Sequence, residues 1–131
     1  MFLIDDHALY RTGLREVIET EPGISVVGEA ERGSGTLDQV VGSGAQIAMV
    51  DLRLPDVSGI EVCHELVAHG NVRCIVLTSF HASEADLVAA TEAGASAYLV
   101  KGGSITQLLA SIKAVAAGTD LLSPTQVHRY P

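Results

Sequence analysis

The sequence Phe2-Leu3-Ile4-Asp5-Asp6 opens the chain with an apolar run that ends in two acids. A second apolar run, residues 47–50, ends in Asp51, and two later runs end in Thr78 and Lys101. Nearly continuous apolar runs are typical of parallel strands that are buried on both faces. Because the carboxyl ends of parallel strands meet at one edge of a sheet, we expect these polar side chains to gather where open α/β sheets bind ligands.

Helical segments alternate with these strands. Apolar residues spaced three and four apart predict helices around residues 9–18, 37–41, 60–67, 87–91 and 105–115. Ser58, Ser83 and Ser104 each precede a helix and are followed three residues later by Glu, Asp or Gln, as in a capping box. Strands are predicted at residues 2–5, 25–30, 47–51, 74–78 and 97–100. Right-handed crossovers then give an α/β fold of the doubly wound (βα)5 type, with a parallel five-stranded sheet.

The composition limits the functions that this chain can have. Its 131 residues suit a single domain, and 16 acids against 8 bases give a net charge of −8. This charge argues against binding of nucleic acid by the chain alone, which needs basic patches. No apolar stretch approaches the roughly 20 residues of a membrane span, and no signal peptide is visible. We therefore expect a cytoplasmic protein without a membrane partner, with Cys63 and Cys74 as core residues.

The expected cluster of Asp5, Asp6 and Asp51 suggests a chemistry. Two carboxylates 4 Å apart repel by about 4 kcal/mol at an effective dielectric constant near 20, so three of them need a counter-charge. Mg²⁺ prefers such oxygen ligands, and Lys101 adds a second positive charge. Asp51 can then act as a nucleophile that forms an aspartyl phosphate, with Mg²⁺ and Lys101 stabilising the transferring oxygens. Thr78 can donate a hydrogen bond to the bound phosphoryl group.

Each of these residues also has a plainer interpretation. Asp6 is a good helix cap, Asp51 can end a strand before a turn, Lys101 can be solvated, and Thr78 suits any strand. His7 is expected to be a solvated residue of the first helical turn, and the other four histidines share no ligand spacing. A common site is favoured because these reactive side chains all lie at the ends of successive strands.

Taken in order, the motifs resemble the receiver domain of two-component response regulators, of the NarL/LuxR type. The resemblance extends to about Leu122 and implies the flavodoxin-like receiver fold. The matching motifs are Asp5-Asp6-His7, Arg11-x-Gly13-Leu14, Val27-Gly28-Glu29-Ala30, Asp51-Leu52-Arg53-Leu54-Pro55-Asp56-x-Ser58-Gly59-Ile60-Glu61, Leu77-Thr78-Ser79-Phe80, Ala93-Gly94-Ala95-x-Ala97-Tyr98-Leu99-Val100-Lys101 and Ala114-Val115-x-Ala117-Gly118.

The resemblance implies roles for the acids. Asp51 would be the phosphoacceptor, receiving its phosphoryl group from a sensor histidine kinase. Asp6 would bind Mg²⁺ directly and Asp5 would do so through water, while the backbone carbonyl of Arg53 would be the third protein ligand. Such a domain is not an enzyme in the usual sense, because it is a stoichiometric phosphoacceptor that catalyses its own phosphoryl transfer and hydrolysis.

The resemblance also implies a switch. Thr78 would follow the phosphoryl group, Lys101 would bind it, and Tyr98 would turn inward as Thr78 moves, although Tyr98 equally suits a half-buried strand position. Phosphorylation would thereby bias a two-state surface. Where many relatives have proline or an acid, this chain has Gly102-Gly103, which we expect to loosen the loop after Lys101.

The expected domain organisation is a receiver at residues 1–118 and, at 119–131, the start of a linker toward a C-terminal helix-turn-helix output domain absent from this chain. Ser123-Pro124 is typical of a helix that is just beginning. The expected partners are the sensor kinase, a second copy in a homodimer, and DNA only through the missing C-terminal domain.

Three alternative functions differ in the residues that they require. A phosphatase of the haloacid dehalogenase kind needs an aspartate two residues after the nucleophile, where this chain has Arg53. A dinucleotide-binding module needs a glycine-rich run after the first strand, but no glycine occurs before Gly13. A receiver that acts through protein contacts without phosphorylation stays open.

Overall fold

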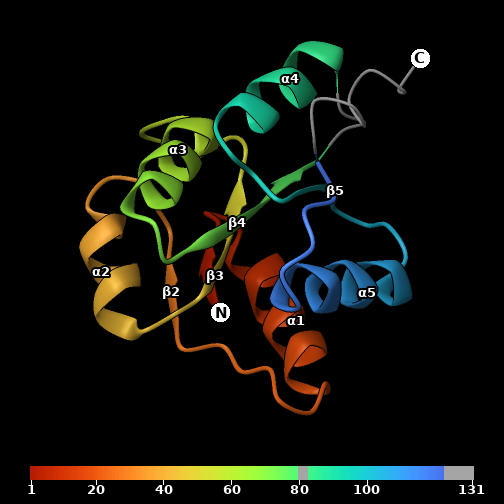
Figure 1. The fold of residues 1–131 in the computed structure, drawn as a ribbon. Helices are drawn as coiled ribbons and strands as arrows, with labels where there is room; N and C mark the ends of the chain where they lie inside the picture. Colours follow the sequence, from red (N-terminus) through yellow and green to blue (C-terminus); the bar gives the residue numbers. More distant parts are fainter. Residues whose placement is uncertain (80–82, 123–131) are drawn as a thin grey trace.

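The computed structural model of the chain describes residues 1–79 and 83–122; Phe80 and the expected helix start at Ser123-Pro124 lie outside these ranges. Five strands alternate with five helices in the described part (Figure 1). In chain order they are β1 (Phe2–Ile4), α1 (Ala8–Glu19), β2 (Gly28–Ala30), α2 (Thr36–Ser43), β3 (Ile47–Asp51), α3 (Gly59–His69), β4 (Arg73–Thr78), α4 (Glu84–Glu92), β5 (Ala97–Val100) and α5 (Ile105–Ala116).

The strands form one parallel sheet in the order β2-β1-β3-β4-β5. This confirms the predicted doubly wound (βα)5 sheet and its flavodoxin-like topology. The strand order reverses between β1 and β3, the place where ligands bind in open sheets of this kind. Asp5 follows β1 and Asp51 ends β3, so both acids lie beside the reversal.

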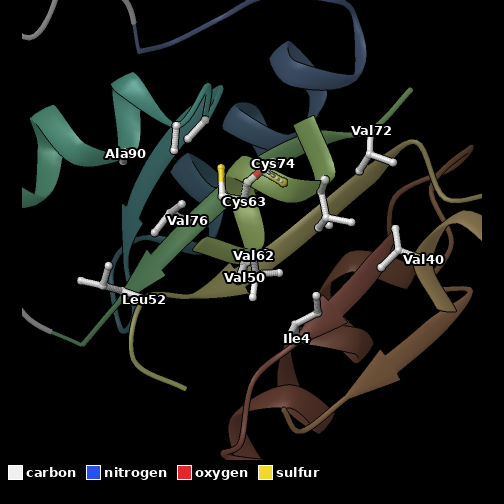
Figure 2. Packing of buried hydrophobic residues seen from close by; sticks show 14 of the residues in the cluster. Ile4, Val40, Val50, Leu52, Val62, Cys63, Val72, Cys74, Val76 and Ala90 are labelled. Atoms are coloured by element: carbon white, nitrogen blue, oxygen red, sulfur yellow. Dashed lines mark hydrogen bonds between the residues drawn. The ribbon is translucent and has the colours of Figure 1, made fainter. Parts of the chain in front are cut away.

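Each inner strand sends alternate side chains into two separate cores. Ile4, Val50 and Val76 belong to the core under α2, α3 and α4, together with Val62 of α3 (Figure 2). Their strand neighbours Leu3, Met49 and Ile75 belong to the core under α1 and α5, with Leu14, Ile18, Ile112 and Val115. Both faces of the sheet are therefore buried, as the continuous apolar runs predicted.

The predicted helix starts are confirmed. The side chains of Ser58, Ser83 and Ser104 accept hydrogen bonds from the backbone N–H of Ile60, Asp86 and Gln107. Each bond satisfies a first-turn donor that has no partner within its helix.

The predicted second strand, residues 25–30, is longer than the observed β2. This edge strand pairs with β1 alone, in the register of Gly28 with Phe2 and Ala30 with Ile4. Val27 still donates to the Met1 carbonyl at 2.8 Å. Residues 25–27 thus approach β1, but they make no ladder.

The segment after α5 is bonded to Ser96, just before β5 begins. Leu121 and Leu122 both donate backbone hydrogen bonds to the Ser96 carbonyl, at 2.6 and 3.1 Å. The Asp120 carboxylate accepts from the Ser96 hydroxyl at 2.9 Å and pairs with Arg73 at 3.1 Å. Leu122 is buried in the core under α2, α3 and α4. The exit of the chain is thereby tied to the amino ends of β4 and β5.

Within residues 1–79 and 83–122, none of the helices has both the length and the apolar character that crossing a membrane requires.

Candidate functional site

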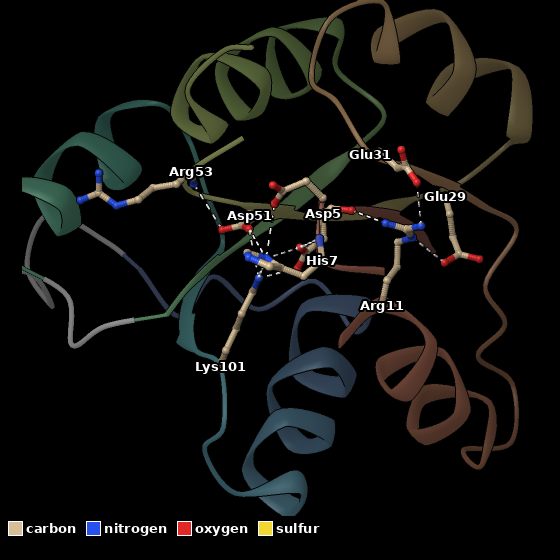
Figure 3. A network of polar contacts seen from close by, with 9 residues as sticks. Asp5, His7, Arg11, Glu29, Glu31, Asp51, Arg53 and Lys101 are labelled. Carbon is tan, nitrogen blue, oxygen red and sulfur yellow. Dashed lines mark hydrogen bonds and ion pairs between the residues drawn. The ribbon is translucent and has the colours of Figure 1, made fainter. Parts of the chain in front are cut away.

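The carboxyl edge of the sheet gathers the expected charges into one site (Figure 3). Asp5 and Asp51 are buried there, at 2 % exposure each, and Asp6 lies beside them on the surface. Lys101 and His7 contact both buried acids. The predicted convergence of residues from the ends of β1, β3 and β5 is therefore observed.

Asp51 occupies the centre of this edge. Its Oδ1 accepts a hydrogen bond from the backbone N–H of Arg53 at 3.2 Å, and its Oδ2 lies 3.0 Å from Nζ of Lys101. Burial raises the pKa of Asp51 and the nearby Asp5 charge adds to this, while the Lys101 ammonium and the Arg53 N–H act in the opposite direction. The effect of burial is the largest, so the pKa of Asp51 is raised and its carboxylate is costly to ionise when metal is absent.

Gly59 holds the turn after Asp51 close to β3. Its N–H donates to the Leu52 carbonyl at 2.8 Å, and Arg53 pairs with Ser58 across the turn. A Cβ on Gly59 would lie 2.1 Å from the Asp51 carbonyl oxygen, a backbone atom that cannot move aside. Only glycine lets α3 begin this close to the strand that ends in Asp51.

Lys101 is held by both buried acids. Its Nζ lies 2.6 Å from Oδ2 of Asp5 and 3.0 Å from Oδ2 of Asp51, and it stands 4.7 Å from the centre of the Tyr10 ring. Burial lowers the pKa of Lys101, but the hydrogen bonds and charges of Asp5 and Asp51 outweigh burial and raise it. Gly102 adopts a left-handed conformation, φ +79°, which suits glycine in the turn after Lys101. Lys101 nevertheless keeps its contacts with Asp5 and Asp51.

A partly buried arginine contacts the backbone of the acid pair. Arg11 of α1 donates from its guanidinium to the backbone carbonyl of Asp5. Its Nε also pairs with Glu29 at 2.9 Å, and Arg15 reaches the same carboxylate at 2.6 Å. The acid pair is thereby fixed to both α1 and β2. In the sequence Arg11 stands out only as part of a motif, because a contact to a backbone carbonyl leaves no spacing signal.

His7 is the residue that the sequence interpretation missed. It was expected to be solvated, and its side chain is 59 % exposed, but its Nδ1 points into the acid cluster. That nitrogen lies 3.0 Å from Asp5 Oδ1, 3.3 Å from Asp6 Oδ1 and 3.5 Å from Asp51 Oδ2, and it lies 3.2 Å from Nζ of Lys101. Its adjacency to the acid pair was the available signal.

The helix-cap interpretation of Asp6 does not apply. The cap residue of α1 is His7, and no side chain caps this helix. Asp6 is instead free to face the cluster, where its carboxylate meets His7.

The expected switch residues lie on β4 and β5. Thr78 is buried, and its backbone carbonyl accepts from the N–H of Lys101 at 2.7 Å. The Tyr98 hydroxyl is buried and lies beside the Thr78 side chain. Burial raises the pKa of Tyr98, and the neighbouring Thr78 side chain opposes this rise. Arg53 extends its side chain away from the acids, so that only its backbone serves the site (Figure 3).

The donor set fits a hard divalent cation. One ligand atom from each of Asp5, Asp6, His7 and Asp51 lies within 4.8 Å of the others. Carboxylate oxygens partly open to water are the ligands that Mg²⁺ prefers. The residues present are thus compatible with metal binding.

Fold and site together define a class, the flavodoxin-like signalling domains that carry an acid cluster at the strand reversal. A family model described as the response regulator receiver domain matches residues 1–113. The chain therefore belongs to the response regulator receiver family.

Known relatives are of the NarL/LuxR type. The chain is 39 % identical over 123 residues to the DNA-binding transcriptional activator DevR/DosR of Mycobacterium tuberculosis, covering 93 % of this chain and 56 % of that protein. It is 34 % identical over 123 residues to the nitrate/nitrite response regulator NarL of Escherichia coli, covering 94 % and 57 %. The chain thus spans a little over half the length of these curated relatives.

Solved structures agree. A two-component response regulator of the LuxR family from Aurantimonas superimposes with a TM-score of 0.86 at 34 % identity, covering 97 % of this chain and 91 % of that chain. The isolated receiver domain of RcsB from Salmonella enterica, solved with the phosphomimetic BeF3⁻, gives a TM-score of 0.83 at 26 % identity, covering 98 % and 94 %.

Proposed function

We propose that this domain accepts a phosphoryl group on Asp51 in the presence of Mg²⁺ and relays the change to an output domain. The single observation that carries this proposal is the contact of buried Asp51 with Lys101 beside the acid pair, at the carboxyl ends of β1, β3 and β5. A buried carboxylate whose charge is only partly compensated is a suitable nucleophile for a cation-assisted phosphoryl transfer.

The metal would be held by Asp6 and Asp51, by the backbone carbonyl of Arg53, and by Asp5 through water. When bound, Mg²⁺ supplies positive charge that neutralises the phosphoryl oxygens. The exposure of Asp6 and the enclosure of Asp5 by Lys101 and His7 support this division between direct and water-mediated contact.

Transfer forms one P–O bond and breaks one P–N bond. An Asp51 oxygen attacks the phosphorus of a phosphohistidine on a sensor kinase, and the P–N electron pair stays with the leaving imidazole. Lys101, already 3.0 Å from Asp51, then pairs with the new phosphoryl oxygens. Because the Lys101 N–H bonds to the Thr78 carbonyl, a shift at one residue reaches the other, and Tyr98 lies next to Thr78.

The output would be control of transcription. DevR/DosR is a DNA-binding activator, and this chain covers 56 % of its length. We infer that the remainder of the full-length protein carries a helix-turn-helix domain and that DNA is contacted through it. A cytoplasmic location and a homodimer that responds to phosphorylation belong to the same proposal.

The test is intact mass after incubation with Mg²⁺ and acetyl phosphate. We expect one added phosphoryl mass in the wild type and in Asp38→Asn, a control on exposed α2, but none in Asp51→Asn. Mg²⁺ binding without added mass, also after incubation with phosphorylated histidine kinases, would favour the receiver that acts without phosphorylation. If Mg²⁺ does not bind, the site assignment is rejected.

A further inference from the structure

His7 has an environment that the proposed function does not use. Its Nδ1 faces three carboxylate oxygens, on Asp5, Asp6 and Asp51, at 3.0–3.5 Å, and the ammonium of Lys101 at 3.2 Å. A carboxylate can only accept a hydrogen bond and an ammonium can only donate one. No single tautomer of the imidazole therefore satisfies all four neighbours through this one nitrogen.

A cation resolves the conflict. Around an octahedral ion with metal–ligand bonds of about 2.1 Å, adjacent ligand atoms lie about 3.0 Å apart. The separations of His7 Nδ1 from Asp6 Oδ1 and Asp51 Oδ2, 3.3 and 3.5 Å, are slightly longer than this edge length. A small movement of the 59 % exposed ring would therefore let this nitrogen bind the same ion as Asp6 and Asp51.

We propose that His7 is a metal ligand that determines which divalent cation this receiver accepts. Together with the carboxylates of Asp6 and Asp51 it adds a nitrogen to an oxygen site, so that Co²⁺, Ni²⁺ or Zn²⁺ compete with Mg²⁺ more strongly than at an all-oxygen site. The physical reason is that imidazole suits the later first-row metals, whereas Mg²⁺ prefers oxygen. This inference rests on the proposed metal-dependent function and adds the identity of the metal to it.

Tighter binding of Co²⁺ than of Mg²⁺ by the wild type alone would not identify a nitrogen ligand, because even an all-oxygen site binds Co²⁺ more tightly. The informative quantity is therefore the ratio of the Mg²⁺ and Co²⁺ dissociation constants, compared between the wild type and a variant without the imidazole. His7→Gln keeps polarity and removes the ring. His64→Gln is the matched control, because His64 is exposed on α3.

Titration calorimetry of the whole chain with MgCl₂ and with CoCl₂ gives this ratio. We expect His7→Gln to weaken Co²⁺ binding ~10-fold or more while Mg²⁺ binding changes less than about 2-fold, since the oxygen ligands remain. His64→Gln should match the wild type. Circular dichroism and the unfolding midpoint check that each variant is folded, and His7→Asn replaces His7→Gln if the latter is not.

A second readout reports the bond itself. Proton NMR of the Co²⁺-loaded wild type should show imidazole ring resonances shifted by the paramagnetic ion. These signals should disappear in His7→Gln and persist in His64→Gln.

An unchanged metal ratio and no shifted imidazole signals would overturn the role of His7. The proposed function would survive that result, provided that Mg²⁺ binds and Asp51 gains its phosphoryl mass. If neither cation binds the wild type, the metal site and the role of His7 are both rejected.

Discussion

Nζ of Lys101 lies 3.0 Å from Oδ2 of Asp51, so this buried carboxylate is paired with a cation of the protein itself. Lys101 is shared, since its contact to Asp5 is shorter, at 2.6 Å. Two buried acids thus depend on one ammonium. The metal-free site is therefore held by a counter-charge that belongs to the protein.

Removing this cation should destabilise the metal-free domain. Lys101→Gln leaves Asp5 and Asp51 buried without an ammonium, and we expect a loss of about 3 kcal/mol, typical of a broken buried ion pair. The pKa of Lys101 is raised, so its contribution is complete below the unfolded value of 10.5 and is lost as pH rises through the folded value. Urea unfolding should show a constant difference from pH 7 to 9 that shrinks above 10.5. A difference that shrinks below pH 9 would contradict this pairing.

Neutralising the Asp51 side chain should have the opposite effect. The pKa of Asp51 is raised from 3.8, chiefly by burial, so its ionisation costs stability as pH rises through and beyond that value. Metal-free Asp51→Asn should therefore be more stable than the wild type at pH 7, by roughly 0.5–2 kcal/mol, as when functional strain is removed. The gain should shrink as pH falls toward 3.8, measured by urea unfolding. Asp38→Asn should show no gain at pH 7.

A methyl group at Gly59 should displace the backbone of Asp51. Its Cβ would lie 2.1 Å from the Asp51 carbonyl oxygen, so the strand end or α3 must shift. We expect Gly59→Ala to cost about 1–3 kcal/mol and to slow phosphoryl uptake from acetyl phosphate. The matched control is Gly42→Ala within α2, where nothing lies within 4 Å and helix propensity should add about 0.5–1 kcal/mol. Equal effects of the two changes would show that Gly59 does not position Asp51.

Residues 120–122, which are bonded to Ser96, should contribute to the stability of the domain. Leu122 is 7 % exposed and lies in the core under α2, α3 and α4. We expect a chain ending at residue 118 to unfold more easily than one ending at residue 122, by about 2 kcal/mol or more, and Leu122→Ala in the full chain to cost about 2–5 kcal/mol. Asp120→Asn should cost under about 1 kcal/mol, because the pair with Arg73 is exposed. Identical unfolding midpoints for the two chain lengths would mean that Leu122 adds nothing.

The sequence was sufficient to predict the sheet, because the cause is local. Residues 47–50 and 97–100 are uninterrupted apolar runs, and the predicted strands at 47–51 and 97–100 agree with the bounds of β3 and β5. The strand end at Asp51 then determines where its carboxylate lies. The caps at Ser58, Ser83 and Ser104 were equally readable, because a cap involves only neighbouring residues.

What the sequence did not reveal depends on contacts between distant residues. Arg11 reaches a backbone carbonyl, and Tyr10 lies beneath an ammonium that is 91 positions away in the sequence. No periodicity reports such contacts. His7 was given its most frequent interpretation, a solvated helix start, whereas its ring turns toward the acids.

The anchoring of residues 120–122 by Ser96 has a consequence for β5. Ser96 holds residues 120–122 at one end of β5, and Lys101 stands at the other end, roughly 17 Å away at about 3.3 Å per residue. Tyr98 lies between them on the same strand. Lys101 of the acid site thus lies just past one end of β5 and the anchored residues 120–122 lie at the other, so a single four-residue strand connects the charged site with the segment after α5.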